Sequence, residues 1–176
     1  KEFECLARDL PSNVRMVMPD DPISSYTLMD LASLGLAYHS TVSLEMACKG
    51  KPVVVSAGSV VTGLPFVLTP NSPTEYISML SSLIHSDKGR NALEIQRQAY
   101  RFAYGLFYRI NIPFPLVTMP NPHKGILAYK SLEDLLPGRE PNLDRIAGII
   151  LDRQPVCPEP TSEELQRSPE EEDAWF

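Results

Sequence analysis

A run of three valines, Val53–Val55, constrains the fold more than any other feature of this sequence. It lies in "KPVVVSA", and a short unbroken run of β-branched residues is typical of a strand buried on both faces, as in parallel sheets. Two further apolar runs precede it, at residues 14–18 and 35–39, and helical patterns that begin at Ser24 and near Ser40 separate the three. This order of strands and helices predicts right-handed crossovers and therefore an α/β, Rossmann-like parallel sheet flanked by helices.

The remainder of the chain reads as a loop followed by helices. Residues 56–70 are rich in Gly, Pro, Ser and Thr and are predicted to form a loop. At Ser72 a helix cap is followed by Pro73 in the first helical position. The predicted elements that follow are a helix over 72–85, a helix with a wide apolar face over 89–110, a proline-rich crossing segment over 111–125, and short helices over 131–136 and 142–152.

Three parts are expected from these patterns. Residues 1–88 form the Rossmann-like domain, residues 89–155 a helical extension that packs on it or bridges from it, and residues 156–176 an acidic, disordered tail. Residues 155–176 hold seven acids and one base, which accounts for the whole net charge of −6. The body is therefore neutral, and this argues against nucleic acid as a partner.

Cysteine and histidine usage gives no sign of a metal or a disulfide framework. Three cysteines and three histidines are widely spaced, without a CxxC or HExxH pattern. A reducing cytoplasm and no bound metal are the simpler expectation. No window reaches the length of about 18 apolar residues that a membrane helix needs, so at most peripheral membrane contact is expected.

Loops rich in small and hydroxyl residues follow the predicted strands, at 19–25, 39–42 and 56–70. In an open parallel sheet, ligands bind outside the carboxyl ends of the strands. A helix that starts at Ser40 or Thr41 offers unpaired amides and two hydroxyls to a phosphate. Glu45 lies on the same helical face as Thr41 and has the chemistry to accept hydrogen bonds from a sugar hydroxyl. The alternative is that Ser40 is only a cap and Glu45 only a favourable first-turn charge.

The first loop, "PDDPISSY", gives the same choice. Asp20 and Asp21 precede Ser24 and Ser25. Two adjacent acids have the chemistry to bind a metal or a ribose; the alternative is that they only form a turn before the proline. The lysines at positions 49 and 51 lie where cations complement a helix carboxyl end, and a structural role is expected for them.

The run "MPDDPISSYTLMDLASLGLAYHSTVSLEMACKGKPVVV" closely resembles the C-terminal half of bacterial capsule polysaccharide biosynthesis proteins. These are glycosyltransferase-like enzymes of the GT-B architecture, which has two Rossmann domains. The resemblance is specific over residues 19–55 and weaker over the rest of 14–155. It is carried by Pro19, Asp20, Ser24, Ser25, Ser40, Thr41, Glu45, Gly50, Lys51, Pro52 and Val53.

The resemblance implies that Ser40 and Thr41 meet the phosphates of a nucleotide-sugar donor linked to UDP, CDP or CMP, and that Glu45 meets its ribose. The donor is a substrate, and no cofactor is expected. The full set of candidate nucleotide- and phosphate-binding residues is Asp21, Ser24, Ser25, His39, Ser40, Thr41 and Glu45.

The expected partners are the donor, a capsular or other surface polysaccharide as acceptor, and an N-terminal GT-B domain that supplies the general base. Catalytic residues within this chain are unknown. The apolar segment over 99–116 also suggests self-association. The expected location is cytoplasmic, with the inner face of the bacterial inner membrane as the place of any membrane contact.

Two other functions stay open at this point. The first is a non-catalytic regulatory or assembly module of polysaccharide export, favoured by Val60 and Val61 where the family usually has an aromatic residue. The second is a sugar-nucleotide epimerase, whose sites use similar helix starts.

Overall fold

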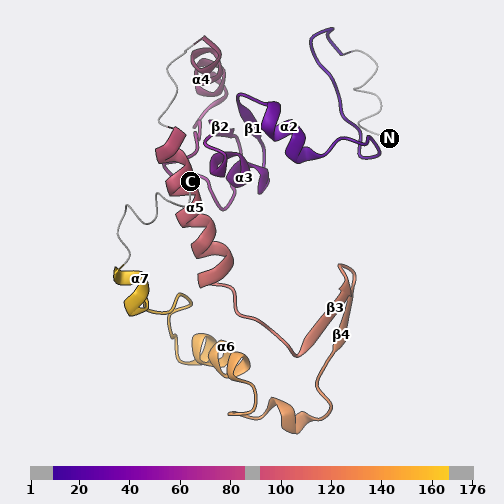
Figure 1. Cartoon of the computed structure of the whole chain (residues 1–176), viewed down its shortest axis with the longest axis vertical. Helices are drawn as coiled ribbons and strands as arrows, with labels where there is room; N and C mark the ends of the chain where they lie inside the picture. Colours follow the sequence, from indigo (N-terminus) through magenta and orange to yellow (C-terminus); the bar gives the residue numbers. More distant parts are fainter. Residues whose placement is uncertain (1–9, 86–91, 167–176) are drawn as a thin grey trace. The chain divides into compact units, whose positions relative to one another are not determined.

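The computed structural model describes residues 10–85 and 92–166, which fall into two compact units, Lys1–Gln96 and Arg97–Phe176 (Figure 1). The first unit is α/β, as the sequence predicts. Its elements are α2 (Ser25–Leu31), β1 (Gly35–Ala37), α3 (Val42–Cys48), β2 (Val53–Val55) and α4 (Pro73–His85). The earlier division into a domain at 1–88, an extension at 89–155 and a tail stays a prediction.

Strands β1 and β2 are parallel, with Leu36 opposite Val54, which confirms the predicted crossover through α3. The backbone of Val54 pairs with β1. On the other side of β2, Val55 N donates to Leu68 O and Leu68 N donates to Val53 O. Leu68 thus extends the sheet on the other side of β2, inside a segment that the sequence predicts to be a loop. Strand β2 is therefore central, and its three valines are almost completely buried.

Helices α2 and α3 run in the same direction, because Tyr26 lies near Glu45 and, one turn later in both helices, Asp30 lies near Lys49. At their carboxyl ends, Lys49 Nζ pairs with Asp30 Oδ1 at 2.6 Å. Lys51 Nζ donates to the carbonyls of Asp30 and Ala32, the latter at 2.6 Å. These bonds satisfy carbonyl groups at the end of α2 that have no partner inside the helix. Both lysines make structural contacts, but to the end of α2 and not, as the sequence predicted, to the end of the helix that precedes them.

The sequence prediction of a strand over residues 14–18 is wrong. The structure places this segment on an arm before α2, where Val14 is 48% exposed. Its hydrogen bonds close local turns: Val14 N donates to Pro11 O, and Met18 N donates to Asp21 Oδ2. This short apolar segment pairs with no strand in the described residues, and hydrogen bonds within local turns hold it instead. The 19–25 loop therefore does not leave a strand.

Helix capping matches the sequence pattern in α4. Ser72 Oγ accepts from Glu75 N at 3.1 Å, and Glu75 Oε2 accepts from Asn71 N at 2.7 Å. This is a reciprocal cap that fixes the first turn. The next predicted helix is also present within the described residues, as α5 (Ala92–Tyr104) and the π-helical turn η2 (Gly105–Arg109). Residues 89–91 of that prediction lie outside the described residues.

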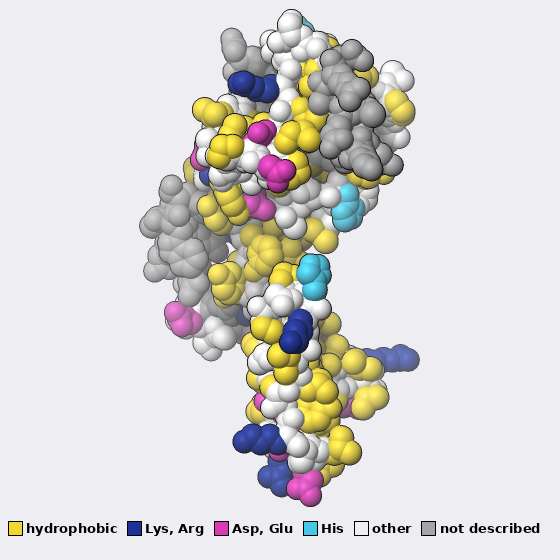
Figure 2. All heavy atoms as spheres, turned by 90° about the vertical axis from the view of Figure 1, so that its right-hand side faces the viewer, with side chains coloured by type: hydrophobic (Ala, Val, Ile, Leu, Met, Phe, Trp, Pro, Cys, Tyr) yellow, Lys and Arg dark blue, Asp and Glu magenta, His cyan; other side chains and the backbone are white. Residues whose placement is uncertain are grey.

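The second unit contains a feature that the sequence prediction missed. The predicted crossing segment over 111–125 instead forms most of an antiparallel hairpin, β3 (Val117–Asn121) and β4 (Lys124–Leu127). Nearly all its residues are exposed, so no buried alternating pattern marks it in the sequence. Hydrophobic side chains accordingly lie at the surface beside scattered Lys and Arg (Figure 2). The two predicted short helices are confirmed as η3 (Leu132–Leu135) and α6 (Pro141–Leu151), and α7 (Ser162–Gln166) follows.

None of the helices in the described residues combines the length and apolar character needed to cross a membrane. Within the acidic tail, the structure describes residues 156–166, and these include α7. The prediction that the tail is disordered lies mainly outside the described residues.

Candidate functional site

Two loops meet at the carboxyl edge of the parallel strands. Strand β1 ends at Ala37 and the parallel strand β2 at Val55, so the chain leaves the sheet at the same edge after each strand. Ser56 N donates to Ala37 O at 3.0 Å, which places the start of the second loop against the end of β1. Residues 38–41 and 56–58 are therefore neighbours, in the position where parallel sheets bind ligands.

Ser40 acts as a helix cap. Its Oγ accepts from Val42 N at 3.2 Å, and its carbonyl accepts from the amide and the hydroxyl of Ser43, the latter at 2.6 Å. The amides of Leu44 and Glu45 donate to Thr41 O. The amides at the start of α3 are thus already used within the turn. The capping role that the sequence left as an alternative is present, and the exposed Ser40 hydroxyl still has a proton to donate.

Glu45 joins the two parallel helices at their amino ends. Thr41 Oγ1 donates to Glu45 Oε1 at 3.3 Å, as their spacing on one helical face predicts. On the other side, a hydrogen bond with Glu45, and then the negative charge of Glu45, raise the pKa of Tyr26. The carboxylate therefore lies between a threonine of its own helix and a tyrosine of α2.

Tyr26 is the residue that the sequence analysis missed. Its side chain is 57% exposed and comes from the first turn of α2. Its position in the candidate "PISSY" loop is the one signal that pointed to it, since it directly follows Ser24 and Ser25. Only the packing of α2 beside α3 brings it to Glu45.

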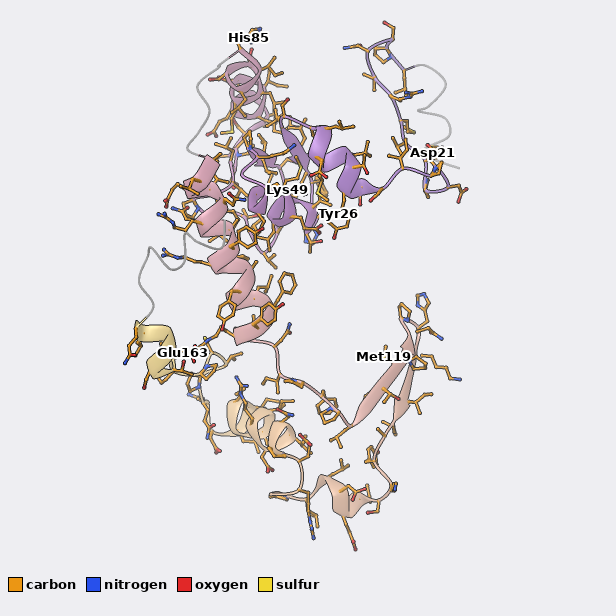
Figure 3. The ribbon with its side chains drawn as sticks, in the orientation of Figure 1. Asp21, Tyr26, Lys49, His85, Met119 and Glu163 are labelled. Carbon is orange, nitrogen blue, oxygen red and sulfur yellow. The ribbon has the colours of Figure 1, made fainter. Side chains whose placement is uncertain are left out.

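The other candidate residues have separate places. Ser24 Oγ caps α2 by accepting from Tyr26 N at 3.2 Å, and the exposed Ser25 is the first residue of that helix. The Asp21 carboxylate closes the turn with Met18, which is the turn-forming role of the two alternatives. Figure 3 shows Asp21 on the arm, apart from Tyr26. His39 is exposed in the loop between β1 and α3.

The structure therefore brings together Ser40, Thr41, Glu45 and Tyr26, with Ser24 adjacent through its cap. It does not bring Asp21 to them. In residues 10–85 and 92–166, no cluster of three or more His, Cys, Asp or Glu side chains is arranged to hold a metal ion. The chemistry on offer is that of hydroxyl donors beside one carboxylate, which suits a phosphate and a sugar hydroxyl.

The loop after β2 is held by its own hydroxyl groups. Ser59 N donates to Thr62 Oγ1 at 2.7 Å, and Thr62 Oγ1 donates to Ala57 O at 3.0 Å. Val61 is buried in the core, whereas Val60 is 61% exposed. Val60 is thus the side chain of this pair that is open to a ligand.

Comparison of the chain with family models, with curated proteins and with solved structures gives no match in any of the three.

Proposed function

We propose that this chain is the donor-binding part of a GT-B glycosyltransferase, which transfers a sugar from a UDP-, CDP- or CMP-linked donor to a surface polysaccharide. The observation that carries the proposal is the parallel β1, α3, β2 unit with Ser40, Thr41 and Glu45 at its carboxyl edge. These are the positions that the resemblance to capsule polysaccharide biosynthesis proteins assigns to the nucleotide.

The local bonds determine how each residue would act. Ser40 Oγ already accepts a hydrogen bond from Val42 N, so its proton is the group it would offer to a phosphate oxygen. Thr41 would have to exchange its bond with Glu45 for one with the phosphate. The Glu45 carboxylate would then turn to the ribose hydroxyls while Tyr26 holds its other side.

In the transfer reaction, the sugar leaves a phosphate group that gains negative charge. Donors placed at that oxygen stabilise the charge as it forms. Ser40 and Thr41 would supply this stabilisation, and the acceptor and the general base would come from an N-terminal domain across the cleft. This chain alone is therefore expected to bind the donor more readily than it turns it over.

Calorimetric titration with UDP, CDP and CMP tests the proposal, and the preferred nucleotide narrows the class of donor. Replacing both Ser40 and Thr41 by Ala should weaken binding of the preferred nucleotide at least tenfold. Ser72→Ala is the matched control, because it removes the cap of α4 in the same unit at a similar cost of about 1 kcal/mol. The control should keep the affinity. Equal affinities for the wild type and the double variant would reject the phosphate role.

Glu45 gives a second and sharper test. Glu45→Gln should lose affinity for ribonucleotides but far less for the 2′,3′-dideoxy analogues, because a charge-assisted hydrogen bond contributes roughly 1.5 to 3 kcal/mol. Glu75→Gln is the control, since Glu75 holds the equivalent first turn of α4. Equal losses for both kinds of nucleotide would exclude a ribose contact.

One observation favours a second function, a regulatory or assembly module without chemistry. The amides of residues 42–45 are bonded within the first turn of α3, so few backbone donors there are left for a phosphate. If none of the three nucleotides binds, this second function is the better one. A sugar-nucleotide epimerase has no observation of its own in its favour.

A further inference from the structure

Strand β1 has one edge that no ladder partner covers in the described parts of the chain. Gly35 N donates to Pro52 O and Ala37 O accepts from Ser56 N, so these two residues direct their backbone groups toward β2. Backbone groups alternate sides along a strand, so the N–H and C=O of Leu36 point to the open edge. The Leu36 side chain is 55% exposed. An open edge of this kind is a template for another strand.

The two helices indicate what belongs on that edge. Helix α3 connects β1 to β2, and α2 lies beside it with the same direction. Tyr26 meets Glu45 at the amino ends, and Asp30 meets Lys49 at the carboxyl ends. Successive right-handed crossovers place their helices in this way on one face of a sheet. The strand that precedes α2 would then run parallel to β1, along its open edge.

The segment over residues 14–18 has the pattern for that strand. Val14, Met16 and Met18 alternate on one face, and the segment makes no ladder in the extended arm (Figure 1). Residues 32–34 connect α2 to β1, and residues 19–24 connect the segment to α2. Both connections have lengths that are usual between the strands and helices of α/β units.

We propose that residues 14–18 of the same chain dock on the open edge of β1 as a third parallel strand, in exchange with the arm seen here. Docking would remove the exposed edge and lengthen the sheet. It would also carry the loop that holds Asp21 to the carboxyl edge where Ser40 and Ser56 lie. The proposal concerns the fold and does not depend on nucleotide binding.

Hydrogen exchange at the Leu36 amide tests it directly. This amide points away from β2, so docking of the segment is what would protect it. Neighbouring amides of a strand point to opposite edges, and proline has no N–H, so Met16→Pro or Val17→Pro must remove a docking bond. We expect exchange at Leu36 to be at least tenfold slower in the wild type than in one of these variants. The Val54 amide, bonded inside the sheet, should stay protected in all three proteins and so report an intact fold. Equal exchange at Leu36 in all three would overturn the proposal.

Crosslinking identifies the occupant. In a chain whose native cysteines are replaced by serine, Met16→Cys with Leu36→Cys should form a disulfide within one chain, because neighbouring strands bring such pairs within bonding distance. Since the register is not fixed in advance, Arg15→Cys and Val17→Cys are tested with the same partner. Met16→Cys with Ile77→Cys on α4 is the control. A disulfide that forms only between two chains, or as readily with position 77, would overturn docking by the chain's own segment.

Discussion

Replacing Lys51 by Met should destabilise the first unit by about 2 kcal/mol. Lys51 Nζ donates to the carbonyl oxygens of Asp30 and Ala32, and its side chain is half-buried. A hydrogen bond that involves a charged group contributes about 1.5 to 3 kcal/mol, and removing the donor leaves two helix-end carbonyls without a partner. Met keeps most of the apolar stem, so the loss reports the ammonium group.

Lys49→Met is the control for this measurement. Lys49 pairs with the exposed carboxylate of Asp30 at the same end of α2, and exposed ion pairs contribute little. Urea unfolding followed by circular dichroism compares the two variants with the wild type. We expect a clearly lower midpoint for Lys51→Met and a small change for Lys49→Met. Equal changes, or a larger one for Lys49→Met, would refute the argument that Lys51 fastens the end of α2.

Three further predictions concern the same unit. The hydrogen bond from Lys49 holds the pKa of Asp30 below its ordinary value of 3.8. The stabilisation of the fold by this bond is therefore present above pH 3.8 and is lost as the pH falls through the lowered pKa. NMR titration should show a higher Asp30 midpoint in Lys49→Met than in the wild type. Burial, and then the negative charge of Glu45, raise the pKa of Cys48 to about 11, so only about a thousandth of this thiol is ionised at pH 8. Peptide mass spectrometry should find Cys48 alkylated far more slowly in the folded than in the unfolded chain. A Cβ at Gly35 would lie 2.5 Å from Met46 Sδ, so Gly35→Ala should cost about 1 to 3 kcal/mol in urea unfolding, and less in a Met46→Ala background.

Local chemistry explains which elements the sequence predicts well. Val53–Val55 reads as a strand buried on both faces because β-branched side chains fill both sides of a central strand. Ser72 and Pro73 mark the start of α4 because a cap and a fixed backbone angle act within a few residues. These signals need no knowledge of the rest of the fold.

Elements that depend on distant partners were not predictable in this way. Residues 14–18 have the pattern of a strand but lie on an arm, because an alternating pattern does not by itself determine whether a segment pairs with a distant strand. The exposed hairpin over 117–127 shows the reverse, since pairing forms it without a buried pattern. In the candidate site, spacing on one helix predicted the contact of Thr41 with Glu45. The approach of Tyr26 comes from the packing of two helices, which spacing along the chain does not encode.

Helix α5 limits where recombination could join part of this chain to another protein. The boundary between the two units falls after Gln96, inside the helix, and Gln96 Nε2 donates to Cys48 O at 2.9 Å while Ile95 is buried. A gene fusion at that boundary would leave the first unit with a helical remnant too short to be stable and would start the second in mid-helix with unpaired amides. Functional chimaeras are therefore expected to inherit Ala92–Tyr104 as one piece, with crossovers outside it.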